Sequence, residues 1–187
     1  MRSGPHHRPH TSRFVILSGC SGGGKTTLLA ELARRGYAVV EEPGRRIVRE
    51  ESRTGGTALP WRDMEAFARR AIETAHRDMA ALEPDGSWVF FDRGLIDAAA
   101  ALEHVTQSSV LDGLAAARSF HRRVFLVPPW PEIFVEDAER RHGLDSAIAE
   151  YERLVRIYAA LGYQVDILPR IGVERRADHV LKTLAED

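Results

Sequence analysis

The chain has 187 residues, of which 44% are hydrophobic and 28% are charged. This length and composition suit one folded α/β domain and exclude a wholly disordered chain. The formal net charge of -1 gives no overall attraction to nucleic acid or to anionic membranes. No apolar run approaches the roughly 20 residues that span a bilayer, and the first residues do not form a secretory signal. We therefore expect a cytoplasmic protein without membrane contact.

Residues 1–12 are rich in Pro, His and Ser and have no hydrophobic period, which predicts a disordered N-terminal tail. The histidines could hold a metal, but no Cys or carboxylate lies nearby, so a solvated terminus is the simpler interpretation. Residues 13–187 contain no internal repeat or linker and are predicted to form a single domain.

From residue 14 onward, short apolar runs alternate with segments of helical periodicity. In chain order we predict strand 14–17, helix 26–35, strand 37–40, helices 44–53 and 61–82, strand 88–91, helices 95–105 and 109–120, strand 124–127, helices 131–141 and 146–161, strand 163–168 and helix 173–185. This alternation predicts an α/β fold with a mostly parallel sheet and helices on both faces.

A glycine-rich segment between the first strand and the first helix matches G-x-x-x-x-G-K-[ST] without a mismatch: Gly19, Cys20, Ser21, Gly22, Gly23, Gly24, Lys25 and Thr26. Its backbone N–H groups and the following helix N-terminus would surround phosphate oxygens. Lys25 would reach the β- and γ-phosphates, Thr26 would ligate magnesium, and Thr27 would contact the α-phosphate. A chance glycine-rich turn seldom lies between a strand and a helix, so we predict that ATP and Mg²⁺ bind here. Cys20 is interpreted as a small residue at a variable position, since nothing in the sequence activates its thiol.

An acidic and then basic corner, Glu41-Glu42-Pro43-Gly44-Arg45-Arg46, follows the second strand. Ligands of open parallel sheets bind outside the carboxyl ends of strands, where this corner falls. Glu42 could accept a proton from an attacking hydroxyl, and Arg45 could hold an anionic acceptor. Glu41 is interpreted as a solvated turn residue.

Four apolar residues, Trp88 to Phe91, run into Asp92-Arg93-Gly94. This is the Walker B pattern, in which the aspartate holds magnesium directly or through water. Arg93 could face the transferred phosphate or the acceptor. A helix-capping aspartate is the alternative, but the upstream phosphate loop favours the metal role for Asp92.

Besides the corner at residues 41–46 and the Asp92-Arg93 pair, a third group of charged residues follows the fourth strand and contains Arg140 and Arg141. These arginines could close over a triphosphate and neutralise developing charge. They could equally form exposed i,i+4 pairs with Glu136 and Asp137. Both interpretations stay open.

Taken together, these residues resemble P-loop kinases of nucleosides and nucleotides, and the AAA-labelled ATP-binding family related to nicotinamide riboside kinase domains. The resemblance covers residues 14–185 and rests on the segments GCSGGGKTT, EEPGRRIV, FFDRGLIDAAA, EDAERRHG and LGYQVDILP. It implies a P-loop NTPase three-layer sandwich whose five parallel strands have the order 2-3-1-4-5.

The resemblance also implies roles for single residues. Glu42 would handle the acceptor, Asp92 and Arg93 would act together, and Arg140 and Arg141 would be lid arginines. Gly94 departs from the pattern, because many of these kinases have Ser, Tyr or His there, and the short lid lacks metal-binding cysteines. The identity of the acceptor does not transfer.

At the level of segments, the resemblance implies a helical cap formed by residues 55–85 and 95–120 and a short lid formed by residues 131–143. The adenine would lie between a lid arginine and the loop at residues 169–173.

The leading hypothesis is a magnesium-dependent kinase that moves the γ-phosphoryl group of ATP to a hydroxyl or phosphate of a nucleoside, a nucleotide or a cofactor precursor. Either Glu42 or Asp92 would orient or deprotonate the acceptor. The residues assigned to transfer are Lys25, Glu42, Asp92, Arg93 and Arg140, with Glu42, Arg45 and Arg93 at the acceptor. The protein would be a monomer or a homodimer.

The alternative is a nucleotide-dependent switch or regulatory ATPase that acts on a protein partner, because no residue dictates an acceptor. A nucleic-acid-linked ATPase is disfavoured by the near-zero net charge and the lack of a DNA-binding motif. A closed pocket lined by Glu42, Arg45 and residues 60–83 would favour the kinase. An exposed apolar patch beside the phosphate loop would favour the switch.

Overall fold

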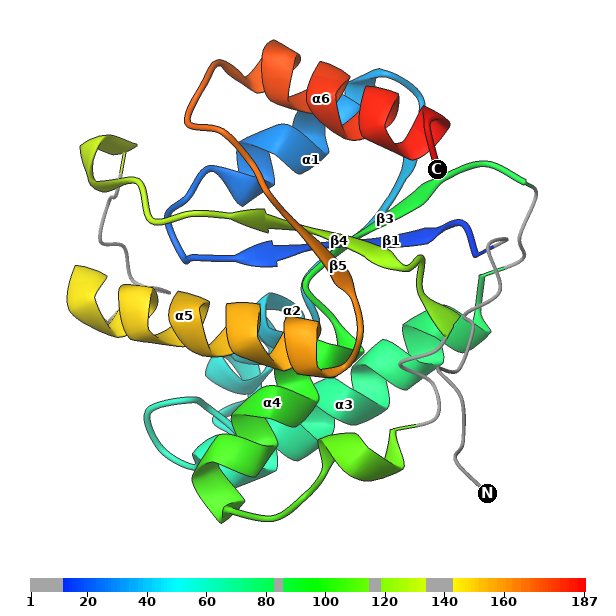
Figure 1. Cartoon of the computed structure of the whole chain (residues 1–187). Helices are drawn as coiled ribbons and strands as arrows, with labels where there is room; N and C mark the ends of the chain where they lie inside the picture. The colour runs from blue at the N-terminus through cyan, green and yellow to red at the C-terminus, as the bar shows by residue number, and fades with distance from the viewer. Residues whose placement is uncertain (1–11, 83–85, 115–118, 134–142) are drawn as a thin grey trace, which may run out of the picture.

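A five-stranded sheet forms the middle layer of the molecule (Figure 1). The computed structural model describes residues 12–82, 86–114, 119–133 and 143–187. The strands are β1 (Phe14–Gly19), β2 (Ala38–Val40), β3 (Val89–Asp92), β4 (Arg123–Val127) and β5 (Gln164–Ile167). All neighbouring strands are parallel, and their order is β2-β3-β1-β4-β5. The predicted fold class and strand order are confirmed.

Helices cover both faces of this sheet (Figure 1), which explains why the strands are continuous apolar runs. Val15 and Leu17 of β1 pack toward α1 (Lys25–Arg34) and α6 (Val173–Ala185). Ile16 packs on the opposite face, in the core shared with α3, α4 and α5. The helices of that second layer are α3 (Met64–Ala80), α4 (Leu95–Thr106) and α5 (Leu144–Ala160).

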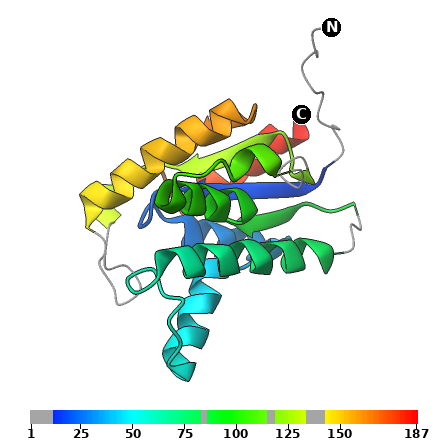
Figure 2. The same cartoon turned by 90° about the horizontal axis from the view of Figure 1, so that it is seen from below.

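Helix α2 (Pro43–Thr54) extends away from the two main layers, as the view from below shows (Figure 2). It packs against α3, and α3 packs in turn against α4. Helix α3 begins at Met64 rather than at Trp61, because the Asp63 side chain accepts a hydrogen bond of 2.9 Å from the Ala66 amide and caps the helix.

The predicted helix 109–120 is wrong. Of its described residues, Leu111–Gly113 form a single 3₁₀ turn, η1, and Leu114 leaves helical geometry with ψ at 76°. Phe120 is buried against Phe91, and the next residue donates its backbone N–H to the Phe14 carbonyl at 2.7 Å. The chain therefore returns to the sheet at Phe120, and this tertiary contact overrides the helical propensity of the described residues around it.

Of the predicted helix 131–141, the structure describes Pro131–Ile133, which form a 3₁₀ turn, η3. Most of the predicted tail (residues 1–11) and most of the predicted lid (residues 134–142) lie outside the described residues. Within the described part of the chain, none of the helices has both the length and the apolar character required to cross a membrane.

Candidate nucleotide and acceptor site

The phosphate loop joins β1 to α1 at the carboxyl edge of the sheet. Gly19, Gly22 and Gly24 all have positive φ, at 111°, 79° and 80°. A Cβ at Gly19 would clash with the Val127 carbonyl of β4, so glycine is required there by both backbone conformation and close packing. The loop is therefore already tightly curved in the ligand-free protein.

Cys20 lies inside this loop and is fully buried. Burial raises the pKa of its thiol, although the nearby positive charge of Arg93 opposes that shift. The thiol therefore stays protonated at neutral pH, which supports its interpretation as a packing residue.

Lys25 begins α1, and its ammonium faces Asp92 at the end of β3. The Lys25 Nζ lies 3.3 Å from Asp92 Oδ1, and the two residues are only 5% and 6% exposed. This contact lacks hydrogen-bond geometry, and Asp92 Oδ1 has no hydrogen-bond partner among the described residues. A buried carboxylate oxygen with unused acceptor capacity, beside the exposed hydroxyl of Thr26, fits a magnesium ion and its bound water.

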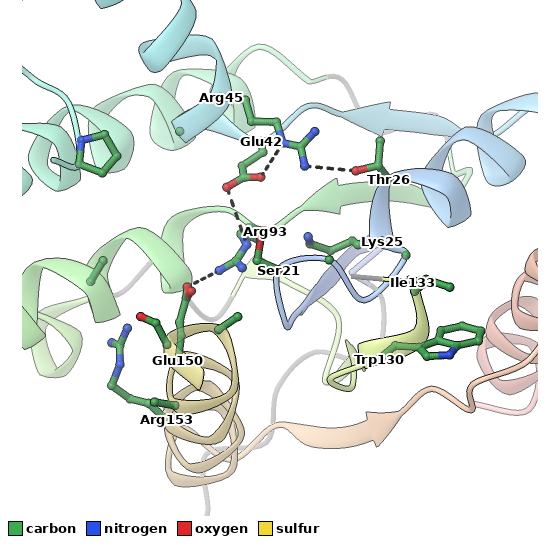
Figure 3. Close-up of a pocket in the computed structure, with 18 of the residues that line it drawn as sticks. Ser21, Lys25, Thr26, Glu42, Arg45, Arg93, Trp130, Ile133, Glu150 and Arg153 are labelled. Carbon is green, nitrogen blue, oxygen red and sulfur yellow. Dashed lines mark hydrogen bonds and ion pairs between the residues drawn. The ribbon is translucent and has the colours of Figure 1, made fainter. Parts of the chain in front are cut away.

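Glu42 and Arg45 connect the acceptor corner to the phosphate loop (Figure 3). Glu42 is the N-cap residue of α2, and Pro43 at the first helical position fixes the turn. The Arg45 Nε lies 3.2 Å from Glu42 Oε2, and Arg45 Nη2 donates to Thr26 Oγ1 at 3.3 Å. The two side chains predicted to handle the acceptor thus lie next to the residue predicted to hold magnesium.

Arg93 is the most heavily paired cation of the site (Figure 3). Its Nη1 lies 2.6 Å from Glu150 Oε1, its Nε lies 3.7 Å from Glu42 Oε1, and its Nη2 donates to the Gly19 carbonyl at 3.0 Å. Burial by itself lowers the pKa of Arg93, but Glu150, Glu42 and Asp97 outweigh it and raise the pKa. The charge of Arg93 is therefore used to hold two carboxylates and the start of the phosphate loop in place.

Two carboxylates of this network were not found from the sequence. Glu150 is on α5, and Asp97 on α4 accepts hydrogen bonds from the Ser18 hydroxyl and from Tyr158, the latter at 2.8 Å. Burial raises the pKa of Asp97, whereas Arg93 and these hydrogen bonds oppose the shift. Asp97 lies within the FFDRGLIDAAA segment but was given no role there, and Glu150 lies in no motif, so the folded arrangement identifies both.

A third residue missed from the sequence is Arg176, in the first turn of α6. It is 2% exposed, and its Nη1 donates to the Gly23 carbonyl at 3.2 Å. Its Cζ lies 5.8 Å from the centre of the Trp130 ring. One weak signal was present in the sequence, because Arg176 follows the 169–173 loop expected to lie near the adenine.

A cavity of about 980 Å³ joins these groups. Figure 3 shows Glu150 and Arg153 on one side of the phosphate loop and Trp130 and Ile133 on the other. The described residues lining the cavity include members of the loop (Ser21, Gly22, Gly24, Lys25, Thr26, Thr27), of the acceptor corner (Glu42, Gly44, Arg45), of α3 (Met64, Phe67), of α4 (Ala101, His104, Val105) and of the last loop (Ile171, Gly172). Its volume is at the upper end of the range for small-molecule sites and has room for a nucleotide and a second small molecule.

The structure thus brings together every predicted site residue that it describes. Arg140 and Arg141, the predicted lid arginines, lie outside the described residues.

The strand order, the phosphate loop and the aspartate at the end of β3 define the protein as a P-loop NTPase with a kinase-like fold. A family model described as an AAA domain matches residues 14–176, and the chain belongs to that family. This membership confirms the resemblance drawn from the motifs.

Solved structures with the same fold include the NadR protein and two shikimate kinases. The NadR protein in complex with NR has 22% identity and a TM-score of 0.68, and the alignment covers 96% of this chain. It covers 52% of the NadR chain, so this protein spans about half the length of that one. Shikimate kinase from Acinetobacter baumannii, in complex with shikimate, has 17% identity and a TM-score of 0.58, with 95% of each chain covered. Shikimate kinase from Aquifex aeolicus has 17% identity and a TM-score of 0.54, with 92% of this chain and 96% of that one covered.

Among curated proteins, no sequence matches this chain significantly.

Proposed function

We propose that the protein is an ATP-dependent, magnesium-dependent kinase that transfers the γ-phosphoryl group to a hydroxyl or phosphate of a small molecule. The observation that carries the proposal is that the phosphate loop and the acceptor corner line one cavity together. Met64 and Phe67 of α3 also line this cavity, which leaves room for an acceptor beside the nucleotide. The structural neighbours that were solved with NR or shikimate support a small-molecule acceptor.

The nucleotide would lie with its phosphates in the loop at Gly19–Thr27. Thr26 and Asp92 would hold magnesium, which neutralises phosphate charge and orients the γ-phosphoryl group for in-line attack. Lys25 would move part of its interaction from Asp92 to the phosphates. Phosphoryl transfer needs little covalent chemistry, so positioning and charge would supply most of the rate acceleration.

Glu42 is the better candidate for the acceptor base, and Asp92 is the better candidate for the metal. The Glu42 side chain is 22% exposed and borders the acceptor half of the cavity, whereas the Asp92 side chain is 7% exposed and touches Lys25. Arg45 and Arg93 hold the Glu42 carboxylate from two directions. A hydroxyl that approached it could give up its proton as the phosphoryl group arrived.

The switch hypothesis would be favoured by an apolar patch beside the phosphate loop. The large apolar side chains exposed in the described part of the chain are Trp61, Val105, Ile133 and Ile167. Of these, Ile133 lies next to the loop, 3.2 Å from the position of a Cβ on Gly24. A single side chain does not make a patch of several hundred Å², so the kinase remains the better supported function.

The test is to follow ADP release from Mg-ATP with and without a panel of nucleosides, nucleotides, hydroxy acids and vitamin precursors. A kinase releases ADP well above its basal rate with one acceptor class and yields a phosphorylated product, and Lys25→Ala abolishes both. Slow hydrolysis that depends on Lys25 and responds to no acceptor would instead support the switch.

A further inference from the structure

Arg176 is a buried cation beside the phosphate loop without an acidic partner in the described part of the chain. Its Nη1 donates to the Gly23 carbonyl, whereas its Nε and Nη2 are buried without a hydrogen-bond partner among the described residues. Burial lowers the pKa of Arg176, and no carboxylate among the described residues opposes that shift. Burying a charge is costly unless the charge is paired, so this arrangement destabilises the ligand-free protein.

The contrast with Arg93 shows how unusual this arrangement is within one site. Arg93 is buried to a similar extent, but Glu150, Glu42 and Asp97 surround its guanidinium. Among the described residues, Arg176 contacts the Gly23 carbonyl and the Trp130 ring and has no carboxylate partner. Within that part of the chain, one buried arginine is thus paired with carboxylates and the other has no counter-charge.

The position of Arg176 indicates where a counter-charge would come from. Its Nη1 is 2.8 Å from the position that a Cβ would take on Gly24, so the guanidinium lies against the phosphate loop itself. Arg176 also lines the cavity, together with Trp130 and Ile133. The N-terminus of α1 begins one residue later and adds positive potential to the same region.

We propose that Arg176 binds phosphate oxygens of the nucleotide, in the diphosphate part that ADP and ATP share. The α6 helix then supplies a second cation to the phosphates, from outside the phosphate-loop motif. This inference rests on the proposed nucleotide site and assigns one more residue to it. Because Nε and Nη2 of Arg176 are buried and the Trp130 ring lies near the guanidinium, the proposal requires these side chains to shift when the phosphates bind.

The first test is calorimetric titration of the full chain with ADP, in the presence of magnesium, and with adenosine. Arg176→Met should weaken ADP binding about tenfold or more, because it removes hydrogen bonds to a charged group, and should leave adenosine binding unchanged. Arg175→Met is the matched control, since Arg175 is the exposed neighbour on α6 and the net charge changes equally. An unchanged ADP affinity overturns the proposal. An equal loss for adenosine also overturns it, because the guanidinium would then contact the base.

Two further variants separate charge from hydrogen bonding. Arg176→Lys keeps the positive charge and should recover part of the ADP affinity. Arg176→Gln keeps a donor for the Gly23 carbonyl without charge and should lose as much affinity as Arg176→Met. Equal affinities for the Lys and Gln variants would overturn the assignment.

The second test is the thermal stability of the same proteins with and without ADP. Removing an unpaired buried charge should leave the Tm of ligand-free Arg176→Met unchanged or higher, while the rise in Tm caused by ADP becomes smaller. A lower ligand-free Tm with a full ADP response would show that Arg176 only braces the loop at Gly23. Neither test uses an acceptor, so a wild-type protein that binds ADP but phosphorylates nothing would refute the proposed function and leave this inference standing.

Discussion

Two pairs of opposite charge lie at the two ends of the site. Lys25 with Asp92 forms the pair at the phosphate loop, and Glu42 with Arg45 forms the pair at the acceptor corner. Arg93 lies between the pairs and contacts Glu42 and the Gly19 carbonyl. A change at one pair should therefore affect a different kinetic parameter from a change at the other.

Lys25→Ala should abolish measurable triphosphate binding while the fold is retained. The substitution removes the buried ammonium that reaches the phosphates, and the Asp92 carboxylate that it leaves behind also repels them. Calorimetry with Mg-ATP measures the loss, and circular dichroism checks the fold. Wild-type affinity in the variant would contradict the assignment of the phosphate loop.

Glu42→Gln should lower kcat for phosphoryl transfer by about 10²- to 10⁴-fold and change the KM for ATP little, because it removes the proposed general base and keeps the side-chain shape. Steady-state kinetics with the acceptor found by the panel measures both constants. Equal effects on kcat and on ATP binding would show that Glu42 is a structural residue or a metal ligand.

Glu31 on α1 gives a prediction about acid stability. Hydrogen bonds from Arg34 and Arg35 lower the pKa of Glu31 to about 2. A carboxyl with a lowered folded-state pKa stabilises the protein above its unfolded pKa and loses that contribution as the pH falls toward 2. Glu31→Gln should therefore be less stable than wild type at pH 7, and the difference should shrink between pH 4.5 and 2. Urea unfolding at several pH values measures it, and a gap that widens in acid would contradict it.

At the level of elements, the turn from β3 into α4 places Asp92 and Arg93 at the site. Arg93 has φ at 57°, and Gly94 follows with φ at 147° and ψ at -144°, a region open essentially to glycine alone. This conformation gives a backbone reason for Gly94, the position at which the chain departs from the pattern of the kinases that it resembles. A Cβ at Gly94 would meet open space, so any cost of adding one comes from the backbone itself.

Gly94→Ala should lower the free energy of unfolding by about 1–3 kcal/mol and disturb the orientation of Arg93. Gly113→Ala is the matched control, because its Cβ would also meet open space and its backbone does not lie in that region. Urea unfolding of both variants measures the difference. Equal stability of the two variants would contradict the strain argument.

Most elements could be predicted from the sequence, because strands buried on both faces and amphipathic helices leave clear periodicities. The helix predicted at 109–120 failed because burial of Phe120 and the return to β1 outweighed local propensity. The boundary of α3 shifted because the Asp63 cap decides where the helix begins. Such tertiary contacts and caps leave weak local signals.

For the whole molecule, the strand order brings the motifs together. Because β3 pairs with β1, Asp92 reaches the phosphate loop, and because β2 pairs with β3, the Glu42 corner lies beside it. These motif residues were predictable, since each follows the carboxyl end of a strand. Glu150 and Arg176 were not predictable, because they lie on α5 and α6, far along the chain, and belong to no motif.

The measurement that tests the central claim most directly follows the fate of the γ-phosphoryl group itself. The purified protein is incubated with magnesium, γ-labelled ATP and a protein-free extract of small molecules, with Lys25→Ala as the blank. The proposed kinase predicts that label appears in an organic phosphate and that this product is absent with the variant. Label found only in inorganic phosphate, at the same rate with and without the extract, would contradict the kinase and leave a nucleotide hydrolase.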